Sequence, residues 1–347
     1  MLNEVLASIT EIDHNMMTTV RNRVENLNKP QGSLGKLEDL VIQVAGITGK
    51  AYPMTDKKAL IVMCADNGVC DEDVASAIQE VTYIQTLNIP RGITGAGAIA
   101  KQMNAKIYAV DIGVMTDIDD AYVINKKVMY GTHNMTKGPA MSRNEAIKAL
   151  EVGIEIAIQA VDEGAKILAT GEMGIGNTST TTAILSVITG IDPSEITGIG
   201  ANFPLEKLAH KADVIKRSIA INKPDVDDPL DILSKVGGLD IAGMAGTMIG
   251  AAYKKVPVVI DGFISTVSAI IACKLNPLVR DYLIPSHYSL EKGAKIATNY
   301  LKLNPFLDMN MRLGEGSGAL LAFNIVEAAC YMNREMITFE EAHFDAL

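Results

Sequence analysis

The chain has 347 residues, with 31 Lys and Arg against 41 Asp and Glu, so its net charge is −10. This charge disfavours nucleic acid as a partner, because a polyanion is repelled unless basic residues are concentrated locally, and the sequence has no basic cluster. A small anionic substrate stays compatible with it, because a few backbone amides and one lysine can hold a phosphate. With 48% hydrophobic and 21% charged residues, the composition is that of an ordinary folded protein.

Targeting and redox features indicate a cytoplasmic protein that does not enter a membrane. The first residues, MLNEVLASITEIDH, lack the basic and apolar regions of a signal peptide. The longest uncharged apolar stretch, residues 241–253, is too short to span a bilayer. The cysteines form no CxxC pair and have no histidine at metal-ligand spacing, so we expect reduced thiols and no metal or other cofactor. They are Cys64, Cys70, Cys273 and Cys330.

The first 50 residues have a helical pattern that a loop interrupts at residues 27–36. The loop contains the segment NKPQGSLGK, which is rich in glycine and proline. The apolar stripe that follows it comprises Leu37, Leu40, Val41 and Val44. Roughly the last 30 residues also have a helical pattern, with a second apolar stripe at residues 325–332. We expect the two ends of the chain to form a small helical domain together.

Four short runs rich in Val and Ile predict parallel strands that are buried on both faces. They cover residues 59–64, 106–110, 166–169 and 256–260. Segments with helical periodicity lie between them, most clearly at residues 142–163. There Ser142 and Glu145 form a capping-box pattern, and Gly164 ends the helix.

The alternation of strands and helices predicts an α/β fold with a doubly wound, mostly parallel sheet and helices on both faces. We expect a large Rossmann-like domain at residues 50–310, and a small helical domain made of residues 1–49 and 311–347. In such sheets ligands bind beyond the carboxyl ends of the strands. The residues that follow each predicted strand are therefore the candidates for a site.

The segment GEMGIGNTST, residues 171–180, lies between a predicted strand and a helix that begins near Asn177. Gly174 and Gly176 permit close approach of backbone amides, and the helix N-terminus adds positive charge, so the segment suits a phosphate. An ordinary glycine-rich turn with a threonine cap explains the same glycines. The pattern is neither a Walker A motif nor GxGxxG, which disfavours a dinucleotide-dependent oxidoreductase.

Three acidic residues follow predicted strands or glycines and are candidates for catalysis. Glu172 lies beside the phosphate segment, where a carboxylate suits a developing sugar cation. Asp261 follows a strand in the same way, although it equally suits an N-cap of the helix through Ile270. Glu315 lies between Gly314 and Gly316, where a substrate can reach it as a general base. A first-turn glutamate stabilised by the helix dipole is the alternative for Glu315.

Two further polar residues suit an anion, although each has a common structural alternative. Lys211 lies near the start of a helical segment and can meet a phosphate as a point charge, or it is simply a solvated lysine. Ser289 can donate its hydroxyl to the same anion, or it caps the helix that follows. His133 and His287 have no partner in the sequence and are interpreted as structural.

Nine segments together resemble one enzyme family over nearly the whole chain. In chain order they are KPQGSLGKLEDL, ADNGV, QEVT, GPAMSR, GEMGIGNTST, DPLDILSKVGG, VPVVIDGFIS, RDYLIPSH and RLGEGSGA. They resemble the nicotinate-nucleotide:dimethylbenzimidazole phosphoribosyltransferases. The resemblance implies transfer of the 5-phosphoribosyl group of nicotinate mononucleotide to a lower-ligand base, which gives nicotinate and the α-riboside phosphate of the cobamide (vitamin B12) nucleotide loop.

The resemblance also implies a role for each candidate residue. Glu315 matches the general base, and Glu172 and Asp261 match acidic positions near the ribose. Gly174, Gly176, Lys211 and Ser289 match the phosphate-binding surface, and Ser76 and Leu313 lie in segments that line the base pocket. Ile175, Asn177 and Gln85 are further candidates for substrate binding. The family forms homodimers, so we expect a homodimer in which KPQGSLGK acts across the interface.

Two departures from the family pattern concern the expected base pocket. Asn67 stands where the family commonly has a histidine, and Ile84 replaces a glutamine, with Gln85 one position later. A hydrogen bond to the base is then lost or shifted, and a more apolar pocket suits a phenolic or purine acceptor. A subunit that acts only with an active paralogue is a further alternative, although the presence of all three candidate carboxylates disfavours it.

Overall fold

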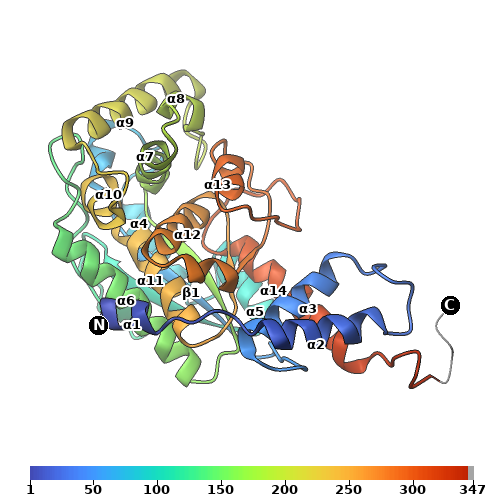
Figure 1. Cartoon of the computed structure of the whole chain (residues 1–347). Helices are drawn as coiled ribbons and strands as arrows, with labels where there is room; N and C mark the ends of the chain where they lie inside the picture. Colours follow the sequence, from blue (N-terminus) through green and yellow to red (C-terminus); the bar gives the residue numbers. More distant parts are fainter. Residues whose placement is uncertain (343–347) are drawn as a thin grey trace.

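The computed structural model describes residues 1–342 and contains a six-stranded, fully parallel sheet with the order β3-β2-β1-β4-β5-β6 (Figure 1). The strands are β1 (Lys58–Ala65), β2 (Ala105–Gly113), β3 (Val123–Asn125), β4 (Ile167–Met173), β5 (Val258–Ile260) and β6 (Leu283–Pro285). The four predicted strands are confirmed. The two edge strands, β3 and β6, were not predicted.

Helices connect the strands and cover both faces of the sheet. They are α1 (Leu2–Ser8), α2 (His14–Glu25), α3 (Lys36–Thr48), α4 (Glu80–Asn88), α5 (Gly95–Gln102), α6 (Arg143–Asp162), α7 (Asn177–Thr189), α8 (Pro193–Ile196), α9 (Leu208–Asn222), α10 (Pro229–Val236), α11 (Leu239–Tyr253), α12 (Phe263–Leu275), α13 (Ala294–Tyr300) and α14 (Ser317–Glu335). The predicted capping box of α6 is formed, since Ser142 and Glu145 exchange side chain-to-backbone hydrogen bonds of 3.2 and 2.7 Å. Short 3₁₀ turns occupy Gly68–Glu72, Leu205–Lys207 and Pro277–Tyr282.

Side chains alternate across β1 and so divide the core into two layers. Ile61 and Met63 pack with α1, α6, α7 and α10 to α12, whereas Leu60 and Val62 pack with α2, α3, α5 and α14. Burial on both faces explains why β1 reads as a continuous apolar run. The α/β class and the doubly wound parallel sheet are therefore confirmed.

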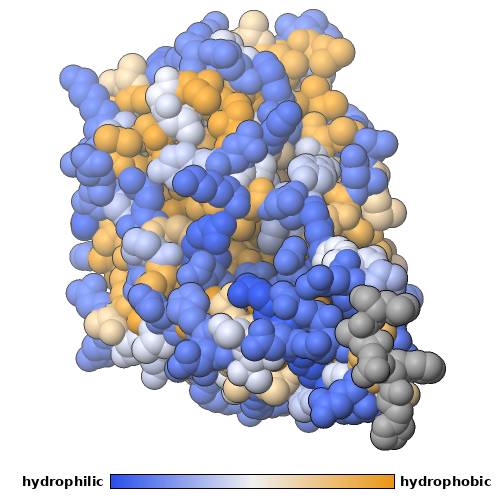
Figure 2. Space-filling view, turned by 45° about the vertical axis from the view of Figure 1, so that its right-hand side comes forward, coloured by the Kyte–Doolittle hydropathy of each residue, from blue (hydrophilic) through white to orange (hydrophobic). Residues whose placement is uncertain are grey.

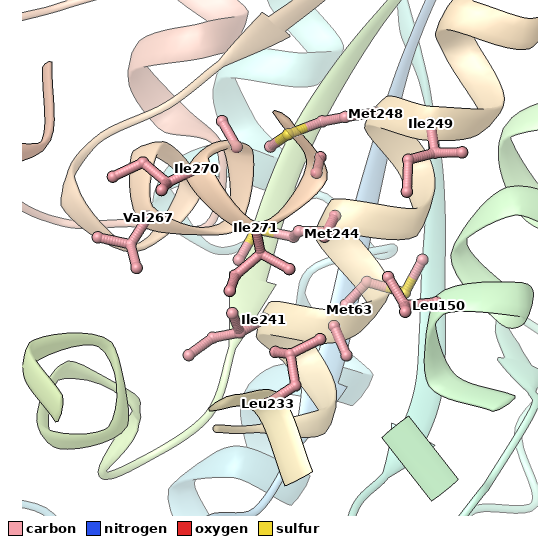
Figure 3. Packing of buried hydrophobic residues seen from close by; sticks show 14 of the residues in the cluster. Met63, Leu150, Leu233, Ile241, Met244, Met248, Ile249, Val267, Ile270 and Ile271 are labelled. Atoms are coloured by element: carbon pink, nitrogen blue, oxygen red, sulfur yellow. The ribbon is translucent and has the colours of Figure 1, made fainter. Parts of the chain in front are cut away.

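Helix α11 lies at the centre of the first layer. Gly246 of α11 faces the carbonyl of Leu150 on α6 so closely that a Cβ would collide with it, and this lets the two helix backbones touch. Met244 and Met248 of α11 fill the space between α6, β1 and α12 (Figure 3). Because α11 is packed tightly on both sides, its first residues, Leu239 and Asp240, are held in a fixed position, with Asp240 against Gly174 at the end of β4.

Helix α1 packs on a different face of the sheet from α2 and α3. Leu2 and Val5 of α1 belong to the layer of α6 and α11, whereas α2 and α3 pack with α14 on the other face (Figure 1). The division into domains at residues 50 and 310 stays a prediction. On the face drawn in Figure 2, hydrophobic side chains form groups among hydrophilic ones. No helix within residues 1–342 is long and apolar enough to cross a membrane.

Candidate active site

A cavity of about 570 Å³ opens at the carboxyl ends of β4 and β5. This is the edge where a doubly wound sheet binds its ligands, and the cavity lies beside β1 and β4, where the strand order reverses. Its walls come from residues 171–178, 261–265, 287–291 and 310–315, with parts of α4. Within residues 1–342 no group of three or more His, Cys, Asp or Glu side chains is arranged to hold a metal ion.

Glu172 lies near the end of β4 and lines this cavity with only 8% of its surface exposed. Its Oε2 accepts a short hydrogen bond from the side-chain amide of Asn177 at the start of α7. Burial raises the pKa of Glu172 to about 8, and the carboxylates of Asp240, Asp261 and Glu315 add to the rise, whereas the Asn177 amide opposes it. Glu172 is thus a buried carboxyl that titrates near neutral pH.

Asp261 directly follows β5, and its carboxylate caps a helix. Oδ1 accepts from the backbone amides of Gly318 at 2.8 Å and Ala319 at 3.1 Å, which are the second and third residues of α14. The N-cap alternative was therefore right in kind but assigned to the wrong helix, because α12 begins after Gly262. Burial raises the pKa of Asp261, and the neighbouring His287, whose Nδ1 lies 3.7 Å from Oδ1, opposes that rise.

Glu315 lies in a strained turn that faces Glu172. Gly314, Glu315 and Gly316 all have left-handed φ angles, of 89°, 60° and 86°. A Cβ on Gly314 would collide with Glu172 Oε1, so this glycine lets the two carboxylates approach each other. Glu315 Oε2 accepts from Ala96 N at 3.0 Å, at the N-terminus of α5. The first-turn alternative is wrong, because Glu315 precedes α14 and meets the dipole of α5 instead.

The glycine-rich segment forms the predicted turn between β4 and α7. Gly174, Ile175 and Asn177 line the cavity, and Gly176 lines a small neighbouring one. The amide of Ile175 is already bonded, since it donates to Thr82 Oγ1 at 3.1 Å. The side chain of Asn177 is also engaged, with Glu172 and Asp240, and its backbone amide donates to the carbonyl of Gly174 at 3.1 Å.

Lys211 of α9 is buried, which excludes the solvated-lysine alternative. Its Nζ donates to Thr178 Oγ1 at 2.9 Å and stands 5.2 Å from the centre of the Phe203 ring. Burial lowers the pKa of Lys211 to about 8, and the nearby Glu291 opposes this fall. Lys211 and Ser76 line a small cavity of about 60 Å³. Residues at the start of α7 line both this cavity and the large one.

Ser76 lies outside the large cavity, whereas Ser289 lines it. Ser76 donates to the carbonyl of Ala201 and lines the small cavity, not the large one. Ser289 lines the large cavity, and its Oγ accepts from Glu291 N at 3.3 Å. The predicted capping role of Ser289 is wrong, because the next helix begins only at Ala294.

The expected base pocket differs from the prediction at the two departing positions. Gln85 and Leu313 line the cavity, whereas Ile84 does not and is 49% exposed, because adjacent residues of α4 point in different directions. A glutamine side chain therefore reaches the cavity at position 85. Asn67 is fully buried and lies against Gly174 and Gly238, so it forms no part of the cavity wall.

Sequence reasoning missed three polar residues of the cavity. Glu291 is 9% exposed, and burial raises its pKa, although Lys211 and Arg312 lower it. Arg312 donates to the carbonyl of Gly200 and to Asn202, both at 2.7 Å. His287 is buried beside Asp261. Arg312 and His287 lie in segments that carry the family resemblance. Their place in those segments could have identified them as cavity residues from the sequence.

Comparisons with known proteins agree over almost the full length. A family model described as phosphoribosyltransferase matches residues 9–344. A nicotinate-nucleotide–dimethylbenzimidazole phosphoribosyltransferase of Alkaliphilus metalliredigens is 54% identical over 98% of both chains, and one of Clostridium acetobutylicum is 48% identical over 99% of this chain and 98% of the relative. The crystal structure of the enzyme with this name from Thermus thermophilus matches with a TM-score of 0.91 and 35% identity, covering 97% of this chain and 100% of that one.

Proposed function

The chain belongs to the nicotinate-nucleotide–dimethylbenzimidazole phosphoribosyltransferase family, and from this premise we propose that it moves the 5-phosphoribosyl group of nicotinate mononucleotide to an aromatic base. The products are nicotinate and the α-riboside 5′-phosphate that enters the nucleotide loop of a cobamide. One nitrogen of the acceptor base attacks C1′ from the face opposite nicotinate. The C1′–nitrogen bond breaks, and its electron pair returns to the nicotinate ring.

One observation carries this proposal: carboxylates from three distant segments meet at a single cavity. Glu172 lies near the end of β4, Asp261 follows β5 and Glu315 precedes α14, and all three line the cavity. Negative side chains suit a reaction in which positive charge develops on the ribose. In the proposed step Glu315 takes the proton from the acceptor base, and Glu172 faces the developing sugar cation.

The phosphate end of the substrate is assigned to the start of α7. Backbone amides of a helix N-terminus, together with Gly174 and Gly176, suit a phosphate, and Lys211 lies beside them on Thr178. Gln85 and Leu313 also line the cavity and suit the acceptor base. The cavity volume of about 570 Å³ is within the range of small-molecule sites.

The direct test incubates the purified protein with nicotinate mononucleotide and 5,6-dimethylbenzimidazole and measures the α-riboside phosphate by chromatography. We expect turnover, and a loss on the order of 10²-fold or more in kcat for Glu315→Gln, because a positioned general base contributes about that much. Glu335→Gln, on the exposed end of α14, is the matched control and retains activity. Full activity of the Glu315→Gln variant would show that Glu315 is not the general base.

The identity of the acceptor needs its own assay. Because Gln85 keeps a polar side chain at the cavity, we propose a benzimidazole-type base as the acceptor. A panel of dimethylbenzimidazole, benzimidazole, adenine, phenol and p-cresol ranks the acceptors by kcat/KM. A higher kcat/KM for phenol or adenine would replace this assignment with the phenolic or purine alternative, and turnover by the isolated chain would exclude dependence on a paralogue.

We further propose a cytoplasmic homodimer. The four unpaired cysteines support a reducing compartment. Large hydrophobic side chains are exposed in this region: Leu313, at 59%, lines the cavity, and Ile78, at 69%, follows the lining residue Ala77. A second copy is proposed to cover them. Light scattering after size-exclusion chromatography is expected to give twice the chain mass of 37.1 kDa, and a monomer would contradict the proposal.

A further inference from the structure

The side-chain amide of Asn177 joins two buried carboxylates. Its Nδ2 donates a short hydrogen bond to Glu172 Oε2 and a second one, of 3.0 Å, to Asp240 Oδ2. When both carboxyl groups are charged, their oxygens only accept, so the amide nitrogen faces them and both of its hydrogens are used. The direction of Asn177 is therefore set by Asp240 on one side and Glu172 on the other.

Asp240 is fixed in place and has no contact with the large cavity. It is fully buried in the first turn of α11, and its Oδ1 accepts from Ile241 N at 3.0 Å. A Cβ at Gly238 would lie 2.5 Å from Oδ1, and one at Gly174 would lie 2.8 Å from Oδ2. Both glycines thus make room for this one carboxylate. Its position at a helix N-terminus favours the charged form.

We propose that Asp240 is a positioning residue, which sets the direction and the charge of the Glu172 carboxylate through the side-chain amide of Asn177. The proposal rests on the proposed transferase function, in which Glu172 faces the ribose. Asp240 orients the Asn177 amide so that one of its hydrogens is aimed at Glu172. At the same time the negative charge of Asp240 opposes the loss of the Glu172 proton.

The charged groups around this trio are mostly acidic. Glu172 is faced by Asp240 of α11, Asp261 after β5 and Glu315 before α14, and Asp240 is also faced by Asp66 after β1. Cys64 of β1 is buried nearby. Burial raises the pKa of Asp240 to about 6, against about 8 for Glu172, so Asp240 releases its proton first.

Two substitutions separate the two effects of Asp240, because they move the Glu172 pKa in opposite directions. Asp240→Asn removes a negative charge near Glu172 and so lowers its pKa. Asn177→Ala removes the hydrogen bond to the charged form and so raises it. The readout is the acid limb of log kcat against pH, which we expect about one pH unit lower in Asp240→Asn and about one unit higher in Asn177→Ala. A merely structural role moves neither limb.

The pH profile also predicts a rescue. Asn177→Ala is expected to lose about tenfold in kcat near neutral pH and to recover most of this loss above the shifted limb. Asp39→Asn, an exposed first-turn residue of α3 outside the cavity, is the matched control and keeps the wild-type profile. Limbs that stay in place, or move in the same direction in both variants, overturn the proposal.

A second measurement does not require enzymatic turnover, so it can be used for variants with little activity. The pH dependence of the unfolding midpoint, compared between each variant and the wild type, also responds to the Glu172 pKa, and it applies to any variant that folds. If Asp240→Asn does not fold, Asp240→Ser keeps an acceptor oxygen without charge and takes its place. A wild-type chain that shows no transferase activity contradicts the proposed function, whereas opposite shifts of the unfolding midpoint would still support the link between Asp240 and Glu172.

Discussion

The ends of β4 and β5 place an acidic residue at similar points of the sheet, yet the two carboxyl groups are held in different ways. Asp261 after β5 is bound by two backbone amides of α14. Glu172 on β4 is bound by one side-chain amide, that of Asn177, which is shared with Asp240. Backbone amides in a helix cannot turn away, whereas a side-chain amide can. We infer that Asp261 mainly holds structure and that Glu172 is the adjustable group.

The most direct test of this difference is to neutralise Glu172 and Asp261 one at a time. Glu172→Gln is expected to lose about 10²–10³-fold in kcat, as for other groups that stabilise charge in a transition state. Asp261→Asn keeps an acceptor oxygen for α14 and is expected to lose roughly tenfold or less. Steady-state kinetics with nicotinate mononucleotide measures both. Equal losses would mean that Asp261 also faces the developing charge directly.

For stability we expect the opposite: replacing Asp261 should lower the free energy of unfolding more than replacing Glu172. Asp261→Ala leaves the amides of Gly318 and Ala319 without their acceptor, which we expect to cost about 2–3 kcal/mol of unfolding free energy. Asp261→Asn is the matched control and loses less than half of that. Denaturant unfolding followed by circular dichroism gives both values. An Asp261→Ala variant as stable as the wild type would show that the cap contributes nothing.

The pH dependence of stability sharpens the contrast further. Between about pH 4.5 and 8 the folded protein holds a proton on Glu172 that the unfolded chain has released, so the free energy of unfolding falls as pH rises through this window. Glu172→Gln lacks this loss. Its stability relative to the wild type is therefore expected to rise by roughly 1–3 kcal/mol from about pH 5 to pH 9. A difference that is independent of pH would contradict a raised Glu172 pKa.

The smallest expected effect concerns Gln85, which lines the cavity from α4. Gln85→Leu removes a polar group from the cavity and is expected to raise the KM for the acceptor base about two- to tenfold, the value of one neutral hydrogen bond. Ile84→Gln is the matched control, because this exposed side chain does not line the cavity. An effect of Ile84→Gln larger than that of Gln85→Leu would restore the base pocket predicted from sequence.

Sequence patterns predicted the structure best where a local pattern is typical of a single structural element. The buried strands, the capping box of Ser142 and the helix that begins at Asn177 were all predicted. The motifs around Glu172, Asp261 and Glu315 identified the family. The patterns failed where direction matters, as with Ile84 and Gln85, because a one-residue offset on a helix turns a side chain by about 100°.

The sequence by itself determined the α/β class, the family and the segments that line the cavity, because these depend on local periodicity and on motifs that stay together in the chain. Only the tertiary structure decided which groups hold the carboxylates. Asp261 caps a helix that begins 56 residues later, and Asp240 reaches Glu172 through Asn177, 63 residues before it. Such contacts depend on how strands and helices pack across the sheet, and no local pattern encodes them.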